Sequence, residues 1–217
     1  MHATILGLAT EVPPHVLSQE NFGPTMGRRL GFNEAQMRLL KRITSGSAIT
    51  KRHTTVPDFL EEGFRGSFFG MDEKSSTPKT SVRNDFYKKE APNLAESVCR
   101  AALQRWGGDP KAITHVISVS CTGMVAPGIE FLMMERLGLS LTVERLGINF
   151  MGCFGAFKGL AIAKALGLES PQHRILVVCT ELCSLHFQED HQVDTMVANA
   201  LFADGAAAIV VGTVPRA

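Results

Sequence analysis

From Pro92 onward, apolar runs typical of buried strands alternate with segments typical of helices. Residues 92–106 predict a helix, because proline is common in a first helical turn and Leu94, Val98 and Trp106 share one face. Strands separated by helices of this length form a largely parallel sheet that is covered on both faces. The fold class predicted from this alternation is α/β.

The other elements of this part follow the same alternation. Strands are predicted at residues 115–121, 143–149, 174–182 and 206–211, and the largely apolar run at 174–182 is typical of a strand of the buried kind. Apolar composition and terminal glycines predict helices at residues 128–137 and 153–166. The pattern is least regular at residues 193–200, where a further helix is expected before the last strand.

The amino-terminal part of the chain is less regular. Residues 3–8 predict a strand, and residues 34–43 predict a helix for which Asn33 is the N-cap. Between residues 54 and 89, glycines and prolines lie among many charges and several phenylalanines. We interpret residues 54–89 as a surface excursion with little regular structure.

The composition argues against several classes of protein. The 217 residues carry 22 basic and 21 acidic side chains, a formal charge of +1, which favours neither nucleic acid nor a membrane as a partner. No apolar run is long enough to span a bilayer, and residues 1–15 lack the features of a secretory signal. Five cysteines with scattered spacing predict a reducing compartment, the cytoplasm, and form no metal-binding motif.

A cysteine stands where a predicted strand meets a predicted helix. In the segment NFMGCFGAFKG, Gly152 permits a sharp turn and Cys153 begins the apolar helix. The amino end of a helix presents unpaired N–H groups and a positive dipole end, which favour a thiolate nucleophile. The backbone N–H of Cys153 is also a candidate donor to an oxyanion. The residues alone leave open the alternative that Cys153 is a small buried hydrophobe.

Four segments together resemble the chalcone and stilbene synthases, the type III polyketide synthases of the thiolase superfamily. They are GCFGAFKGL, ALFADGAAAIVVG, VSCTGMVAPGIEF and RILVVCTEL. The resemblance implies that residues 1–217 form the amino-terminal, thiolase-like domain of such an enzyme. That domain is one half of a duplicated α-β-α-β-α architecture, with a mixed, mostly parallel five-stranded sheet.

The resemblance also implies roles for individual residues. Cys153 takes the place of the acyl-carrying nucleophile, and Phe202 that of the gatekeeper between the coenzyme A tunnel and the cavity. Cys121 and Thr122 fall on a pair that lines the initiation and elongation cavity, where plant members usually carry threonine and serine. Two further cavity positions, commonly threonine in the family, fall on Cys183 and His186.

Basic residues that hold coenzyme A match the family less well. Arg42 falls on one position that binds coenzyme A phosphates in the family, but the other two positions fall on Leu39 and Gly46. Three nearby cations could compensate as point charges for phosphate: Lys41, Lys51 and Arg52.

By this resemblance, the expected activity is iterative acyl transfer. Malonyl-CoA would condense with decarboxylation onto an acyl-CoA starter held as a cysteine thioester, giving a pyrone or resorcinol-like product. Coenzyme A thioesters are the expected substrates, no separate cofactor is expected, and the expected assembly is a homodimer. The unusual cavity residues Cys121 and His186 favour a microbial type of product over a plant-like chalcone.

The family's catalytic histidine and asparagine lie in the second half of the duplicated fold, and neither motif occurs in this chain. We therefore expect the chain to be a fragment that requires a carboxy-terminal half. Two alternatives stay open. One is a condensing enzyme like β-ketoacyl synthase III or hydroxymethylglutaryl-CoA synthase, and the other is a non-catalytic thiolase-fold subunit. The sequence leaves open the starter, the number of extensions and the ring closure.

Overall fold

A computed structural model describes residues 2–61, 64–70 and 77–214. The chain divides into two compact units, and each is described by itself. Among the described residues, the first unit comprises 2–11, 87–181 and 205–214, and the second comprises 12–61, 64–70, 77–86 and 182–204.

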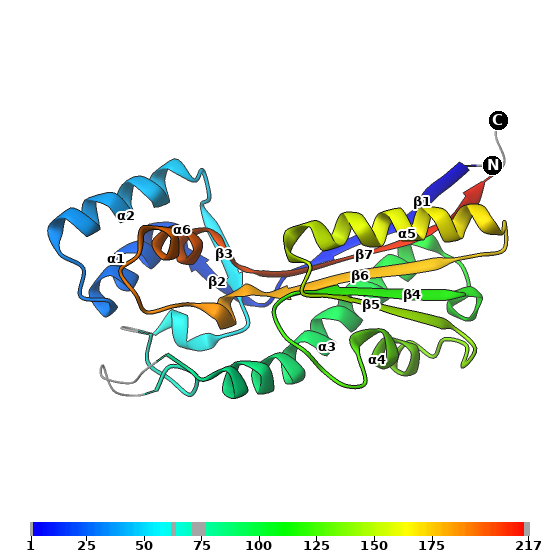
Figure 1. Cartoon of the computed structure of the whole chain (residues 1–217), viewed down its shortest axis with the longest axis horizontal. Helices are drawn as coiled ribbons and strands as arrows, with labels where there is room; N and C mark the ends of the chain where they lie inside the picture. Colours follow the sequence, from blue (N-terminus) through cyan, green and yellow to red (C-terminus); the bar gives the residue numbers. More distant parts are fainter. Residues whose placement is uncertain (1, 62–63, 71–76, 215–217) are drawn as a thin grey trace. The chain divides into compact units, whose positions relative to one another are not determined.

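The first unit is built around a five-stranded sheet with the strand order β1-β7-β6-β4-β5 (Figure 1). The strands are β1 His2–Glu11, β4 His115–Ser120, β5 Glu144–Asn149, β6 Ile175–Leu182 and β7 Asp204–Val214. β4 runs parallel to both β5 and β6, whereas β1 runs antiparallel to β7. The predicted α/β class and the mixed five-stranded sheet are therefore confirmed.

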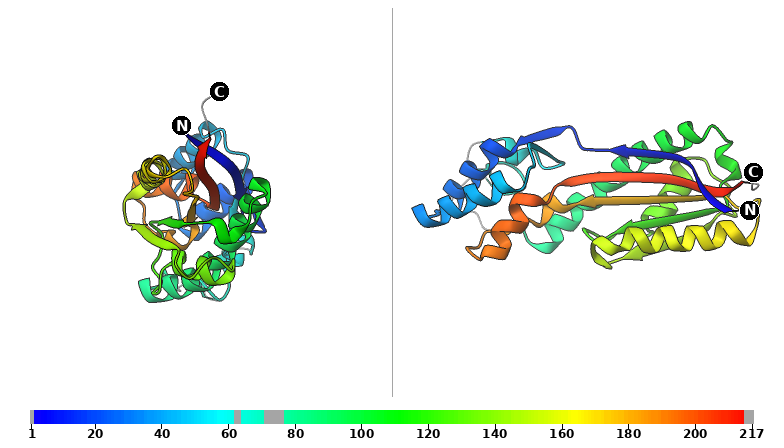
Figure 2. Two further views of the ribbon diagram at one scale, coloured as in Figure 1. Left: turned by 90° about the vertical axis from the view of Figure 1, so that its right-hand side faces the viewer. Right: turned by 90° about the horizontal axis from the view of Figure 1, so that it is seen from above.

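Helices cover both faces of this sheet. α5 (Gly155–Glu169) lies on one face, and α4 (Ile129–Arg136) and the carboxyl part of α3 (Thr80–Trp106) lie on the other (Figures 1 and 2). Every residue of β4 is buried, as expected of a strand enclosed by two helical layers. Ile117, Ile175 and Val177 lie at the centre of the core, each with at most 2% of its surface exposed.

Strands β1 and β7 are longer than the sequence predicted. β1 was expected at residues 3–8 and β7 at residues 206–211, but the pairing extends from His2 opposite Val214 to Glu11 opposite Ala206. The prediction relied on apolar side chains and therefore stopped at the polar residues near both ends of β1. Backbone hydrogen bonds to β7 do not depend on side-chain polarity, so the strand continues through these residues.

Helix α3 begins at Thr80, twelve residues before the predicted start at Pro92. Pro92 therefore lies inside the helix rather than in its first turn, and it is buried. The earlier turns are held by tertiary packing, since Tyr87 is only 1% exposed and Ala91 is fully buried. A prediction from periodicity stopped at the proline because proline usually ends or begins a helix.

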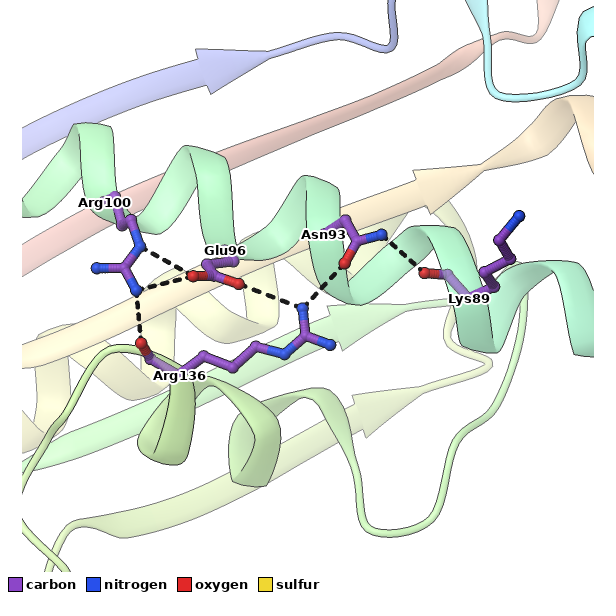
Figure 3. A network of polar contacts seen from close by, with 5 residues as sticks. All are labelled: Lys89, Asn93, Glu96, Arg100 and Arg136. Atoms are coloured by element: carbon purple, nitrogen blue, oxygen red, sulfur yellow. Dashed lines mark hydrogen bonds and ion pairs between the residues drawn. The ribbon is translucent and has the colours of Figure 1, made fainter.

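A polar network on the surface joins α3 to α4 (Figure 3). Arg136 donates to Asn93 Oδ1 at 3.0 Å and to Glu96 Oε2 at 3.2 Å, and Arg100 donates to the carbonyl of Arg136 at 2.6 Å. The hydrogen bond from Arg100 is the main reason that the pKa of Glu96 is lowered. Exposed ion pairs of this kind each contribute little to the free energy of unfolding. The main effect of the network is therefore to fix the position of α4 against α3.

The described residues of the second unit include a two-stranded antiparallel sheet and the helices α1, α2 and α6, together with the first turns of α3. Its elements are β2 His15–Ser18, β3 Lys51–Thr54, α1 Gln19–Arg29, α2 Glu34–Gly46 and α6 Val193–Leu201. The predicted N-cap is confirmed, because Asn33 Oδ1 accepts from the Gln36 N–H and Gln36 Oε1 accepts from the Asn33 N–H, each at 3.0 Å. This reciprocal pair is a capping box.

The interpretation of residues 54–89 as a surface excursion is wrong for much of the segment. Phe59, Phe64 and Phe69 are at most 6% exposed and pack with Phe22 and Phe187 in one aromatic cluster. The ring centroids of Phe59 and Phe64 lie 4.9 Å apart in an edge-to-face arrangement. Residues 62–63 and 71–76 of the predicted excursion lie outside the described residues. The phenylalanines of this segment therefore form the core of the second unit.

In the described part of the chain, no helix is both long and apolar enough to cross a membrane.

Candidate active site

The turn that carries Cys153 lies between β5 and α5. After β5 the chain passes through two residues in the left-handed region, Phe150 with φ of 56° and Gly152 with φ of 70°. A short 3-10 turn, Gly152–Phe154, then leads directly into α5. Cys153 thus lies two residues before the α-helix rather than on its first residue. Its side chain is exposed, which rules out the alternative of a buried core cysteine.

Glycines bring α5 close to the sheet beneath it. A Cβ atom on Gly155 would lie 2.9 Å from Val119 Cγ1, and one on Gly159 would lie 3.2 Å from Val119 Cγ2 and 3.3 Å from Val177 Cγ1. Larger residues at these positions would lift the helix and the cysteine turn away from β4. The small residues of the segment therefore fix the height of Cys153 above the sheet.

Cys121 follows β4 and contacts the cysteine turn. The backbone N–H of Gly152 donates to Cys121 Sγ at 3.0 Å, and this sulfur lies 3.6 Å from the carbonyl oxygen of Gly152. Because Gly152 immediately precedes Cys153, the structure brings these two predicted site residues together within the first unit.

A carboxylate on β6 organises the end of β4. Glu181 accepts from the N–H of Cys121 at 2.9 Å and from the hydroxyl of Thr122 at 2.7 Å. Glu181 therefore fixes both Cys121 and Thr122, the pair that the family resemblance places in the cavity lining. Glu181 was not among the predicted site residues, although it is the one carboxylate in the largely apolar run RILVVCTEL.

A buried tyrosine completes this network. Tyr87 Oη on α3 donates to Ser120 Oγ at 2.7 Å, and burial is the first cause that raises the pKa of Tyr87 to about 12. The ring lies against the backbone of Gly123, where a Cβ atom would come within 2.0 Å of the ring. The phenol therefore stays protonated at neutral pH and acts as a fixed donor beneath the site.

Three other predicted site residues lie in the second unit. Cys183 and His186 belong to a 3-10 turn, Cys183–His186, that follows β6; Cys183 is half-buried and His186 is exposed. Phe202 directly follows α6, and its side chain is 54% exposed. Phe202 is therefore not part of the aromatic core of the second unit.

The basic residues differ in whether a phosphate could reach them. Arg42 lies exposed on α2, and Lys41 on the same helix lines a groove of about 810 Å³ that is bounded by α1 and α2. Arg52, in contrast, is only 5% exposed, and its guanidinium donates to protein oxygens. The suggestion that Arg52 compensates for missing phosphate ligands is therefore wrong.

The turn that carries Cys153 and the first turns of α5 expose large apolar side chains. Phe154, Phe157 and Leu160 are 57%, 63% and 39% exposed, and the two phenylalanine rings lie 5.6 Å apart. The exposed lysines Lys158 and Lys164 lie on the same helix. Exposed apolar side chains that gather in this way often mark a contact surface. Among the described residues, no cluster of histidine, cysteine and carboxylate side chains is suited to a metal ion.

Alkylation should distinguish Cys153 from the interior cysteines. Burial raises the pKa of Cys99 strongly and that of Cys179 to about 11, so neither forms much of the reactive thiolate at neutral pH. We expect iodoacetamide at pH 7.5 to modify Cys153 at least about tenfold faster than Cys99 or Cys179, as measured by peptide mass spectrometry. Equal rates in the folded protein would contradict the exposed position of Cys153.

The chain is similar to known polyketide synthase sequences. A family profile described as "Chalcone and stilbene synthases, N-terminal domain" matches residues 1–215. "Probable polyketide synthase 1" of Dictyostelium discoideum is 39% identical over 212 residues, a match that covers 98% of this chain and 6% of that protein.

Two solved structures are similar in fold as well as in sequence. One is the C-terminal type III polyketide synthase domain of Steely1, a type I/III hybrid from Dictyostelium, with 36% identity and a TM-score of 0.89. The other is PKS-I from the brown alga Ectocarpus siliculosus, with 30% identity and a TM-score of 0.90. The matches cover 100% and 99% of this chain but only 58% and 57% of those two chains.

Proposed function

The chain belongs to the chalcone and stilbene synthase family, and we propose that it is the amino-terminal half of a type III polyketide synthase that uses Cys153 as its nucleophile. The observation that carries the proposal is the exposed Cys153 at the turn between β5 and α5. Cys121 contacts the residue before Cys153, and Glu181 holds both Cys121 and Thr122 by hydrogen bonds. The surroundings of the proposed nucleophile are therefore ordered on this side.

The proposed first step is acylation of Cys153. The thiolate attacks the thioester carbonyl of an acyl-CoA, forming a bond from Sγ to carbon; the bond to the coenzyme A sulfur then breaks, and coenzyme A leaves as the thiol after taking up a proton. Cys153 lies exposed at the turn before α5, where an acyl-CoA thioester can reach its sulfur.

The proposed second step is chain extension. Loss of carbon dioxide from malonyl-CoA leaves an enolate, whose carbon attacks the acyl group on Cys153. The bond to Sγ breaks, and the extended chain leaves as a β-ketoacyl-CoA that can reload the cysteine. In the family, a histidine and an asparagine of the second half assist this step, so we expect a carboxy-terminal half to supply them. The exposed face of α5 supports the presence of such a neighbour.

The substrate-lining residues bear on the product. We propose that Phe202 separates the coenzyme A tunnel from the cavity and that Cys183 and His186 line the cavity. Cys121 is less able to form hydrogen bonds than the threonine common at its position in the family, and His186 adds size and a titratable group at its position. This supports a pyrone or resorcinol-like product. Arg42 is the proposed contact to coenzyme A phosphate, since it is exposed on α2, and the proposed assembly is a homodimer.

The number of malonyl units added to each starter tests the proposal. The full-length protein is incubated with an acyl-CoA and isotope-labelled malonyl-CoA, and the products are counted by mass spectrometry. We expect two or more units for each starter, followed by cyclisation. A single extension would instead indicate an enzyme like β-ketoacyl synthase III or hydroxymethylglutaryl-CoA synthase. No incorporation by correctly folded protein would indicate a non-catalytic subunit.

A further inference from the structure

A buried polar cluster in the second unit surrounds the backbone that carries Phe202. Its centre is Arg52 on β3, whose guanidinium carbon lies 4.0 Å above the centre of the Phe22 ring. Arg52 Nη1 donates to the carbonyls of Asn199 and Phe202, each at 2.8 Å, and Nε donates to Gln19 Oε1 at 2.8 Å. One side chain therefore holds the last turn of α6 and the residue that follows it.

Gln19 adds a second connection to the same turn. Its Nε2 atom donates to the carbonyl of Ala200 at 2.7 Å, and its side chain is oriented by the hydrogen bond from Arg52. The carbonyl groups at the end of a helix lack intrahelical donors and need partners elsewhere. Here Gln19 and Arg52 supply those partners, and all of their contacts are buried or partly buried.

On the other side of Phe202, the carboxylate of Asp204 fixes the chain. Asp204 accepts from the N–H and the hydroxyl of Ser184 at 2.7 and 2.6 Å, and from the N–H and the hydroxyl of Thr55 at 2.7 and 2.9 Å. The Thr54 hydroxyl also donates to Ser184 Oγ at 2.8 Å. Because Ser184 directly follows Cys183, the same carboxylate holds the start of the turn that carries Cys183 and His186.

The Phe202 ring itself has few constraints of its own. Its side chain is 54% exposed, whereas Arg52 and Asp204 on either side of it are each only 5% exposed. Within the second unit, the position of the ring is therefore set by the fixed backbone at Asn199, Phe202 and Asp204 rather than by close packing around the ring.

We infer that Arg52 and Asp204 are positioning residues that hold Phe202 and Cys183 in a fixed relation within the second unit, and that they thereby determine which starters and chain lengths are accepted. The inference rests on the proposed function of Phe202 and Cys183. Neither Arg52 nor Asp204 is assigned a contact with substrate.

Electrostatics supports a structural use of this pair. Burial lowers the pKa of Arg52 to about 10, although attraction to Asp204 opposes the change. Arg52 thus keeps its charge at neutral pH. Burial also raises the pKa of Asp204, against the hydrogen bonds from Ser184 and Thr55. Buried charges add little net stability compared with apolar side chains, but they specify geometry when their hydrogen bonds are directional.

The test is Arg52→Lys in the full-length protein. Lysine keeps the charge but lacks the planar fork that reaches Gln19 and two carbonyls at once. We expect kcat/KM for the acyl-CoA starter to fall about tenfold and the distribution of product chain lengths to broaden, because displacing a group that positions substrate lowers turnover. The matched control is Arg83→Lys. Arg83 is a buried arginine of the same unit whose Nε atom donates to the Pro78 carbonyl at 2.7 Å rather than to the Phe202 segment, so its replacement should leave the distribution unchanged.

A double-mutant cycle separates positioning from a general loss of folded protein. If Arg52 acts through Phe202, Arg52→Lys should have no further effect on chain length in a Phe202→Ala background. A loss of folded protein would lower the total yield in both backgrounds and leave the product ratio constant. Full additivity of the two substitutions, or an unchanged distribution for Arg52→Lys alone, would overturn the inference.

Hydrogen exchange keeps the test independent of activity. The backbone amides from Phe202 to Gly205 should exchange at least about tenfold faster in Arg52→Lys, because that variant loses the hydrogen bonds from Arg52 to the Asn199 and Phe202 carbonyls. The same amides should exchange at the wild-type rate in Arg83→Lys. If the wild-type protein adds no malonyl units, the proposed function fails while this measurement still decides the positioning role. Unchanged exchange in Arg52→Lys would overturn that role.

Discussion

Replacing Cys153 with alanine in the full-length protein is expected to abolish the acyl-enzyme and to lower the rate of product formation by about four orders of magnitude or more. The reason is that the proposed mechanism carries the chain between extensions as a thioester on Cys153. Cys153 is exposed at the start of a helical segment, whereas Cys99 and Cys179 have raised pKa values because they are buried. Intact-mass analysis after incubation with acyl-CoA measures the adduct directly.

Cys121→Ala is the informative comparison for this experiment. Cys121 Sγ lies 3.0 Å from the Gly152 nitrogen and is therefore the thiol placed next to the cysteine turn. We expect the Cys121→Ala protein to keep its acyl adduct, even if its product changes. An adduct that persists in Cys153→Ala and disappears in Cys121→Ala would show that Cys121, and not Cys153, is the nucleophile. Circular dichroism should show that both variants are folded.

The second large effect is expected for Gly7→Ala in β1. A Cβ atom at Gly7 would lie 2.5 Å from the carbonyl oxygen of Ala102 and 2.8 Å from the nitrogen of Trp106, both in the backbone of α3. Backbone atoms cannot move aside as a flexible side chain can, so the helix must shift away from the strand. We expect a loss of about 3 kcal/mol in the free energy of unfolding, at the upper end of typical overpacking effects.

Urea unfolding measures this loss, with Trp106 as a local probe because it is the only tryptophan in the 217 residues. Gly46→Ala is the matched control, since no atom lies within 4 Å of a Cβ at that helical position. That substitution should stabilise the protein by about 0.5–1 kcal/mol through reduced flexibility of the unfolded chain. Equal midpoints for the two variants would refute the close approach of β1 and α3.

The interior strands β4 and β6 could be predicted from the sequence because they are largely apolar runs, which can be recognised without knowing their partners. Each differs from its prediction by one residue at one end, β4 at its carboxyl end and β6 at its amino end. The turn at Cys153 could be predicted for a similar reason, since Gly152 and the small residues after it lie next to one another in the sequence. Local patterns were sufficient for these features.

Long-range contacts could not be predicted in the same way. The cluster around Phe59 and Phe64 depends on Phe22 and Phe187, and a phenylalanine among charges gives no sign of partners so distant along the chain. The hydrogen bonds of Glu181 have the same character, because Cys121 is 60 residues away. Arg52 appeared to be a surface cation for phosphate, since no sequence pattern reveals that a single arginine is enclosed.

The apolar outer face of α5 has a consequence for any attempt to divide this protein. A half that is produced alone would present Phe154 and Phe157 to water, and exposed aromatic patches of this kind promote association. If the proposed carboxy-terminal half covers this face, two halves expressed as separate chains would be soluble only when they bind each other. Such a pair would make a split reporter, in which recovery of soluble protein signals that two fused partners have met inside a cell.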